Sequence, residues 1–162
     1  MKHIIYLFLL IFLFSNCSHR ITRIGYDKNK SSVQDCEVII KKDPSYYNPK
    51  AVKVGEIKIG ETGFSVSCSE EQAIEILKNE ACVLQADLII IKHENRPDFW
   101  STCYRCQADF YKYSISIPSE VAQNDNEYDL EKVEKRVSKD RGRVAGYLIG
   151  SVVFAVLVLL LM

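Results

Sequence analysis

The sequence has no excess of charge of either sign: Lys plus Arg number 21 and Asp plus Glu number 21, so the formal net charge is zero. A general nucleic-acid-binding protein usually shows a basic excess, so this balance argues against nucleic acid as a partner. Apolar residues make up 48% of the chain and charged residues 26%, which excludes a wholly disordered protein. The length of 162 residues predicts one small domain.

Metal ligands and catalytic motifs are also scarce. Histidine occurs three times, without the paired spacing of a zinc site, and the CxxC motif at 103–106 has no second copy. In redox proteins such a motif starts a helix, which lowers the pKa of its thiol, whereas residues 108–117 have the pattern of a strand. No serine–histidine–acid set, phosphate-binding loop or pair of carboxylates is evident. The sequence therefore predicts a protein without enzymatic activity, metal or cofactor.

Long apolar runs occur at the two ends of the chain. Residues 1–16 have a short positive start and then an apolar run over 4–14, which is the pattern of a secretory signal peptide and is too short to cross a bilayer as a helix. Cys17 follows directly, and residues 14–17 resemble a bacterial lipobox, whose cysteine receives a diacylglycerol and becomes the first residue of the mature protein. The alternative is a plain signal peptide, with Cys17 as an ordinary thiol.

The second apolar run covers 144–162 without a charged residue, and a helix of this length would span the hydrocarbon core of a membrane. Gly142, Gly146 and Gly150 recur at every fourth position, so they share one helix face, where small residues let another helix approach closely. The alternative explanation is that glycine is common in membrane helices. We expect a transmembrane helix here, which anchors the protein in membrane lipid together with Cys17.

The segment before this run bears on the orientation of the protein. Residues 119–143 are polar and basic, and Leu130, Val133 and Val137 at helical spacing predict a linker helix. The positive-inside rule would place the basic flank in the cytoplasm, whereas a cleaved export signal would place it outside. Because export of the N-terminus commits a long following segment to the far side, we expect an extracytoplasmic domain whose basic flank contacts anionic lipid headgroups. The alternative is a tail-anchored cytoplasmic protein.

The residues between the two ends predict an α+β domain over 35–118, joined to Cys17 by a flexible polar tether over 17–34. Apolar patterns indicate strands near 36–40, 52–59, 64–68, 86–92 and 106–117, with a hairpin turn over 60–63. The alternation changes phase at Gly55, as it does at a β-bulge. A helix is expected from Ser69, with Gln72 completing a capping box. The expected fold is a small, mainly antiparallel sheet covered on one face by this one helix.

The cysteines bear on the cellular compartment. Five remain besides Cys17, a number that suits an oxidising compartment in so small a domain. Because five is odd, at most two bridges form within the chain, and one thiol stays free or pairs elsewhere. Cys82 lies nearly opposite Ala73 on the helix that starts at Ser69, among polar residues, so we expect it to be exposed and free.

The stretch 54–113 resembles a known family. The matching pattern consists of Val54-Gly55-Glu56, Cys68 before the helix, Ala86-Asp87-Leu88-Ile89 after it, Cys103-Tyr104-Arg105 and Ala108. It is similar to the soluble domain of the outer-membrane lipoproteins that sense envelope stress for the Rcs phosphorelay, and to small bacterial lipoproteins of the same design. The resemblance implies a Cys68–Cys103 bridge. For a second bridge we expect Cys36 with Cys106, because each lies on the apolar face of its predicted strand.

Together these features predict a non-enzymatic, membrane-anchored lipoprotein of the cell envelope that binds a partner or senses stress. Its partners would be membrane lipid, through Cys17 and 144–162, and an envelope protein. Trp100 is expected to fold back onto the sheet, although an exposed aromatic would mark a partner surface. Two other classes stay open: a thiol–disulfide oxidoreductase that uses the CxxC motif or Cys82, and the tail-anchored cytoplasmic protein.

Overall fold

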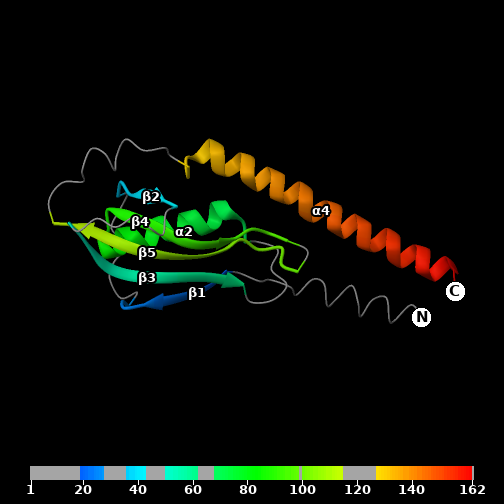
Figure 1. Cartoon of the computed structure of the whole chain (residues 1–162), viewed down its shortest axis with the longest axis horizontal. Coiled ribbons are helices and arrows are strands. Elements are labelled where there is room, and N and C mark those ends of the chain that lie inside the picture. The colour runs from blue at the N-terminus through cyan, green and yellow to red at the C-terminus, as the bar shows by residue number, and fades with distance from the viewer. Residues whose placement is uncertain are drawn as a thin grey trace.

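The computed structural model describes residues 19–27, 36–42, 50–61, 68–98, 100–114 and 127–161, with the side chains of 148 and 151–161 left aside. Within these residues the chain forms a five-stranded sheet and two helices, which confirms the α+β class (Figure 1). The strands are β1 (His19–Ile24), β2 (Ile39–Lys41), β3 (Ala51–Glu61), β4 (Leu88–Asn95) and β5 (Arg105–Tyr113), and the helices are α2 (Glu70–Leu84) and α4 (Leu130–Leu161).

The sheet has the strand order β1-β3-β5-β4-β2, so β5 is its central strand. Three pairings are antiparallel, whereas β2 runs parallel to β4, so the sheet is mixed. The register of β3 against β5 shifts between Lys53 and Gly55, which confirms the predicted bulge. Glycine is needed at 55 because a Cβ there would lie 2.7 Å from Cδ1 of Tyr26, whose ring packs edge-on against Phe110.

Strand β1 corrects the predicted tether over 17–34, because it belongs to the folded domain. It pairs with β3 from His19 opposite Glu61 to Ile24 opposite Glu56. Arg23 on this strand donates from Nε to Glu80 of α2 at 3.0 Å, and Tyr26 donates its hydroxyl to the same carboxylate at 3.2 Å. A strand with this many polar residues has the composition of a linker, and only its partners across the fold hold it in the sheet.

Helix α2 begins and packs largely as predicted. Ser69 is the N-cap and accepts a hydrogen bond from the Gln72 backbone at 3.4 Å, while the Gln72 side chain accepts one from the Ser69 backbone at 3.2 Å, which confirms the capping box. Gln85 ends the helix in the left-handed conformation, with φ of 52°. Its buried face covers the sheet and includes Ala73, Ile74, Leu77 and Ala81.

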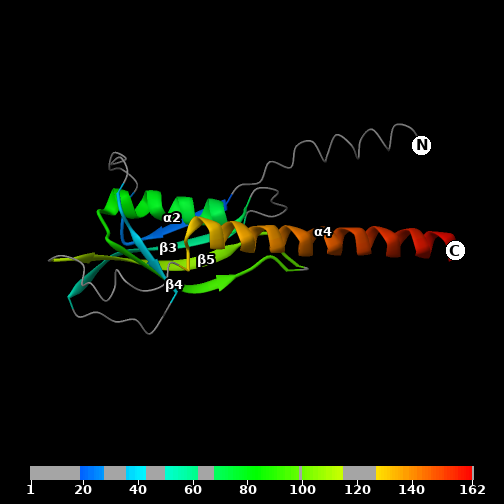
Figure 2. The same ribbon diagram turned by 90° about the horizontal axis from the view of Figure 1, so that it is seen from above.

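Helix α4 corrects the expectation of a single covering helix. Its first half docks on the domain beside α2, and Val133 and Val137 are buried in the main core together with Tyr128 (Figures 1 and 2). The predicted helical stripe is confirmed at these two valines, whereas Leu130 is 71% exposed. The helix then continues past the domain to Leu161, so the predicted segments 119–143 and 144–162 share one helix from residue 130 onward.

No helix among the described residues is both long enough and apolar enough to cross a membrane. The predicted signal peptide over 1–16 and the lipidation site Cys17 lie outside the described residues.

Candidate functional site

Three parts of the chain meet at the start of α2, and we call this meeting point the α2 junction. It comprises Cys68 and Glu70 at the N-terminus of α2, Arg96 in the β4–β5 loop, and Arg136 and Asp140 on α4. The junction is where α4 is attached to the rest of the domain, so it governs how the two parts are held relative to each other.

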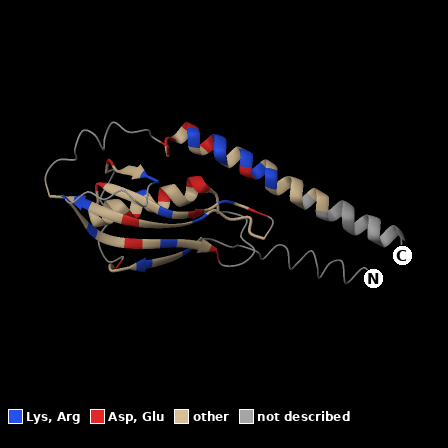
Figure 3. Cartoon of the chain, viewed as in Figure 1, with Lys and Arg blue, Asp and Glu red and all other residues tan. Residues whose placement is uncertain are grey.

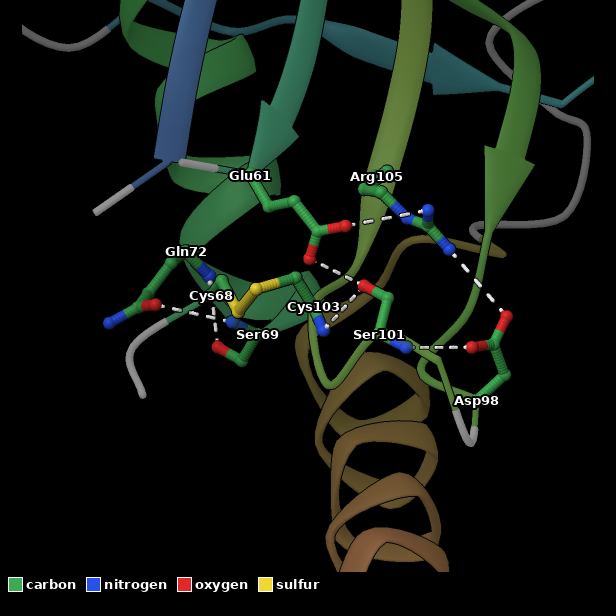
Figure 4. Close-up of a disulfide and its surroundings, with 8 residues drawn as sticks. All are labelled: Glu61, Cys68, Ser69, Gln72, Asp98, Ser101, Cys103 and Arg105. Carbon is green, nitrogen blue, oxygen red and sulfur yellow. Dashed lines mark hydrogen bonds and ion pairs between the residues drawn. A yellow bond between two sulfur atoms is a disulfide. The ribbon is translucent and has the colours of Figure 1, made fainter. Parts of the chain in front are cut away.

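The first component of the junction is the disulfide between Cys68 and Cys103, the pair that the resemblance implied (Figure 4). Its Cα atoms lie 4.9 Å apart, and the backbone N–H of Tyr104 donates to the carbonyl of Cys68 at 2.9 Å. Cys68 directly precedes the N-cap Ser69, and Cys103 lies just before β5. The bridge therefore ties the start of α2 to the start of the central strand.

The second component is a buried ionic cluster around Glu70, whose side chain has no exposed surface. Arg136 donates to its Oε1 from Nε at 2.9 Å and from Nη2 at 2.6 Å. Arg96 donates from Nη2 to Glu70 Oε2 at 2.8 Å and to Asp140 Oδ2 at 2.7 Å. Two cations and two anions thus neutralise one another, which is the condition for burying charge without a large penalty.

Aromatic rings and electrostatics reinforce this cluster. The guanidinium of Arg96 lies 5.8 Å from the ring centre of Tyr104, and that of Arg136 lies 5.3 Å from the ring centre of Tyr128. Hydrogen bonding to Glu70 is the main cause that raises the pKa of Arg136 above its ordinary value. Burial by itself would lower the pKa of Arg96, but its hydrogen bonds to Glu70 and Asp140 raise that pKa above its ordinary value.

Glu94 on β4 extends the cluster to the two tyrosines. It accepts the hydroxyl of Tyr104 at 2.9 Å and that of Tyr128 at 3.5 Å, and it forms an ion pair with Lys42. Burial alone would raise the pKa of Glu94, but the hydrogen bonds from Lys42 and Tyr104 lower it below its ordinary value. The segment before α4 is therefore held by polar contacts as well as by the core.

Hydrogen bonds tie residues 98 and 100–101 of the β4–β5 loop to one another and to β3, next to the junction. Oδ1 of Asp98 accepts hydrogen bonds from the backbone N–H groups of Trp100 and Ser101, both at 2.8 Å. The hydroxyl of Ser101 donates to Glu61 at 2.6 Å, and Figure 4 shows Ser101 between Glu61 and Asp98. Trp100 is 90% exposed, so the expectation that it folds back onto the sheet is wrong. The Asp98 turn and the Cys103 bridge fix the loop in a shape that leaves this ring in solvent.

The second disulfide corrects two predictions. Cys36 is bonded to Cys82, with Cα atoms 5.6 Å apart, and not to Cys106. Cys82 is 8% exposed, because the chain before β2 crosses this side of α2, so it is neither exposed nor free. Cys106 is the free cysteine of the described residues and is buried in the central strand β5. The position of Cys82 around the helix axis does not show that a segment 46 residues earlier in the chain covers this side of α2.

Cys106 is expected to be chemically inert in the folded protein. Burial, followed by the charges of Glu94 and Glu70, raises the pKa of its thiol from 9.0 to about 12. Iodoacetamide at pH 8 should therefore label Cys106 only after unfolding, as measured by mass spectrometry of its peptide. Because the folded pKa is the higher one, the stability contributed by the neutral thiol is present below pH 9 and is lost as the pH rises toward 12. Rapid labelling of the native protein would contradict this.

The sheet face away from α2 carries other paired charges. Nζ of Lys53 lies 2.9 Å from Oε2 of Glu56 and 2.9 Å from Oδ1 of Asp109. Nζ of Lys92 lies 3.0 Å from the same Asp109 oxygen. The hydrogen bond from Lys53 is the main cause that lowers the pKa of Glu56 to about 2. These groups satisfy one another across neighbouring strands, which is the ordinary arrangement on the polar face of a sheet, so we do not assign them a functional role.

The remaining predicted site residues are not brought together. Gly142, Gly146 and Gly150 lie on the exposed part of α4, and beyond the adjoining helix backbone no described residue comes within 4 Å of where their Cβ atoms would be. The CxxC cysteines are not bonded to each other, since Cys103 pairs with Cys68. No group of three or more His, Cys, Asp or Glu side chains in the described ranges is placed to hold a metal ion.

The ionic cluster was not predicted from the sequence, although one signal for it was present. Arg136 and Asp140 follow Val133 at steps of three and seven residues, so they lie on the same helix face as the buried valines. Charged residues on an apolar stripe indicate buried partners of opposite charge.

Comparisons with known proteins give no further guidance: the chain matches no protein-family model, no curated protein and no solved structure.

Proposed function

We propose that this protein is a non-enzymatic lipoprotein domain of the cell envelope, attached to one membrane through Cys17 and through the apolar end of α4, and that it binds a partner or senses stress there. The observation that carries the proposal is where the two predicted attachments leave the domain. They leave it at the same end of the sheet, as a protein attached twice to one membrane requires.

Short contacts at this end of the sheet support the proposed arrangement. His19, the first residue of β1, pairs with Glu61, and Glu61 accepts the Ser101 hydroxyl of the β4–β5 loop at 2.6 Å. Arg96 at the base of the same loop contacts Asp140 on α4 at 2.7 Å, just before the apolar run. Cys17 precedes His19 by two residues, a span of at most about 7 Å. Figures 1 and 2 show α4 extending away from the domain beyond this end.

Two further features support an extracytoplasmic location and a binding role. The two disulfides are typical of an oxidising compartment, and one of them is the bridge implied by the resemblance to the Rcs stress-sensing lipoproteins. A thiol oxidoreductase would need an accessible thiol of low pKa. Cys103 has no exposed surface, and burial raises the pKa of Cys106, so neither cysteine of the CxxC motif meets that need.

A sensing role would use the α2 junction. Helix α4 buries two valines and one ionic cluster against the domain, whereas the sheet and α2 are held by their own core and by two disulfides. Separation of α4 would therefore leave a folded domain with Glu70 and Arg96 uncovered. We propose this separation as the conformational change that a partner or an envelope stress would favour.

Mass spectrometry of the intact protein, purified from the membranes of a bacterial host, tests the attachment. We expect a mature chain that starts at a lipid-modified Cys17 and contains both disulfides. The variant Cys17→Ser should lose the lipid and keep the disulfides. A purified protein that retains Met1, with an unmodified Cys17 and reduced cysteines, would overturn the proposal in favour of the tail-anchored cytoplasmic alternative.

A further inference from the structure

Trp100 is the one tryptophan of the chain, and it has an unusual position. It is 90% exposed on the β4–β5 loop, whose described residues are restrained by the hydrogen bonds to Asp98, by the Ser101–Glu61 hydrogen bond and by the Cys68–Cys103 bridge. Such a constrained loop displays its aromatic ring at little cost in conformational entropy. The ring is therefore prearranged for contact with something outside the domain.

The loop lies at the level where the apolar part of α4 begins. Arg96 at its base contacts Asp140, and residue 144 is about 6 Å further along the helix at 1.5 Å per residue. Tyr147, one turn past Arg143, is 40% exposed on this part of α4. In Figure 4, Asp98 and Ser101, which flank Trp100, lie at the end of the sheet beside α4. Two exposed aromatics thus stand near the boundary between the charged and the apolar parts of the helix.

Positive charge surrounds this boundary. Lys139, Arg141 and Arg143 are exposed on the last turns of α4 before the apolar run, where Figure 3 shows Lys and Arg along the first half of the helix. Asp140 is buried and paired with Arg96, while Arg143 lies 4.0 Å from it. The two other acidic groups beside the loop, Asp98 and Glu61, each lie 3.6 Å from Arg105. The charge that this end presents to solvent is therefore mainly cationic.

We propose that this end of the domain, formed by Trp100, Tyr147 and the three cations, rests on the surface of an anionic lipid bilayer. Tryptophan and tyrosine favour the headgroup level of membranes, and lysine and arginine are attracted to anionic headgroups. A bilayer is the occupant that the geometry favours, because the chain leading to Cys17 and the apolar run of α4 both leave the domain at this end. The inference rests on the proposed membrane attachment and adds a third contact, which fixes the tilt of the domain.

The fluorescence of Trp100 tests this contact directly in the full chain, since no other tryptophan contributes to the signal. The protein is reconstituted into vesicles of phosphatidylcholine and phosphatidylglycerol that contain lipids brominated near the headgroup end of the acyl chain. We expect a blue shift of the emission, quenching by the brominated lipid, and protection from iodide relative to the unfolded protein. All three effects should be weaker in vesicles of phosphatidylcholine alone, because the attraction of the cations to anionic headgroups is lost.

A matched control moves the tryptophan to the far end of the sheet. Val52 is 60% exposed near the start of β3, opposite Lys112 at the end of β5. The double variant Trp100→Phe/Val52→Trp should float with the vesicles but show neither the blue shift nor the lipid quenching. If the wild-type chain floats with the vesicles and Trp100 stays open to iodide, the bilayer contact is wrong. If the chain does not float at all, the membrane attachment fails as well.

Discussion

Replacement of Glu70 by glutamine is expected to lower the free energy of unfolding by about 2–3 kcal/mol, because it leaves two arginines with one carboxylate between them. The Glu70 side chain has no exposed surface and accepts hydrogen bonds from both Arg96 and Arg136. Since these contacts join α2 to α4, the variant should also detach the first half of α4. Urea unfolding measures the loss of stability, and hydrogen exchange of the amides around Val133 and Val137 measures the detachment.

The neighbouring residue provides a matched control for this variant. Glu71 has the same charge and lies in the same first turn of α2, but it is exposed. Glu71→Gln should therefore change stability by less than about 0.5 kcal/mol and leave the exchange of α4 unchanged. Equal effects of the two substitutions would show that the charge at the helix N-terminus matters and the α2 junction does not.

Removal of the Cys68–Cys103 bridge, as the double variant Cys68→Ala/Cys103→Ala, is expected to cost about 4 kcal/mol by the chain-entropy relation for a loop of 35 residues. This is a large share of the 5–15 kcal/mol that is typical of a small domain, so the variant should be close to unfolding at 37 °C. Chemical denaturation under non-reducing conditions measures the loss.

The other disulfide separates the general effect of a cross-link from the effect on the junction. The Cys36–Cys82 loop of 46 residues is similar in length, so Cys36→Ala/Cys82→Ala should cost a similar amount. It lies away from the N-terminus of α2, so it should leave the hydrogen exchange of α4 unaltered, whereas loss of Cys68–Cys103 should increase it. Increased hydrogen exchange of α4 in both variants would show that the Cys68–Cys103 bridge beside Glu70 has no special role in holding the helix.

These two predictions concern the same property, the fixed position of α4 on the domain. A helix that joins a membrane anchor to a folded domain transmits any change at the junction to the anchor, and the reverse holds by linkage. The junction combines a disulfide that does not respond to pH or salt with an ionic cluster that contacts the loop bearing Trp100. The proposed lipid contact of that loop and the docking of α4 would therefore influence each other through Arg96.

Several features were predictable because their causes are local in the chain. The capping box needs Ser69 and Gln72 three residues apart, and the bulge follows from a change in the apolar alternation near Gly55. The buried run of β4 follows from consecutive isoleucines. The Cys68–Cys103 pair came from a resemblance and not from such a local pattern.

Other features depend on residues that are distant in the sequence. Strand β1 has linker-like composition, and it became part of the sheet through Glu61 and Glu80. The parallel pairing of β2 with β4 decided that Cys36 lies over α2 beside Cys82, which left Cys106 as the free thiol. Patterns of apolar residues do not specify which distant partner a polar strand or a cysteine finds.

The sequence by itself determined the α+β class, the start of α2, the bulge in β3 and the apolar character of both ends, because each depends on neighbouring residues and their periodicity. The tertiary structure decided the membership of β1, the Cys36–Cys82 bridge, the Glu70 cluster and the exposure of Trp100. These depend on which distant segments pack together, and buried charges are stable only where folding brings their partners within hydrogen-bond distance.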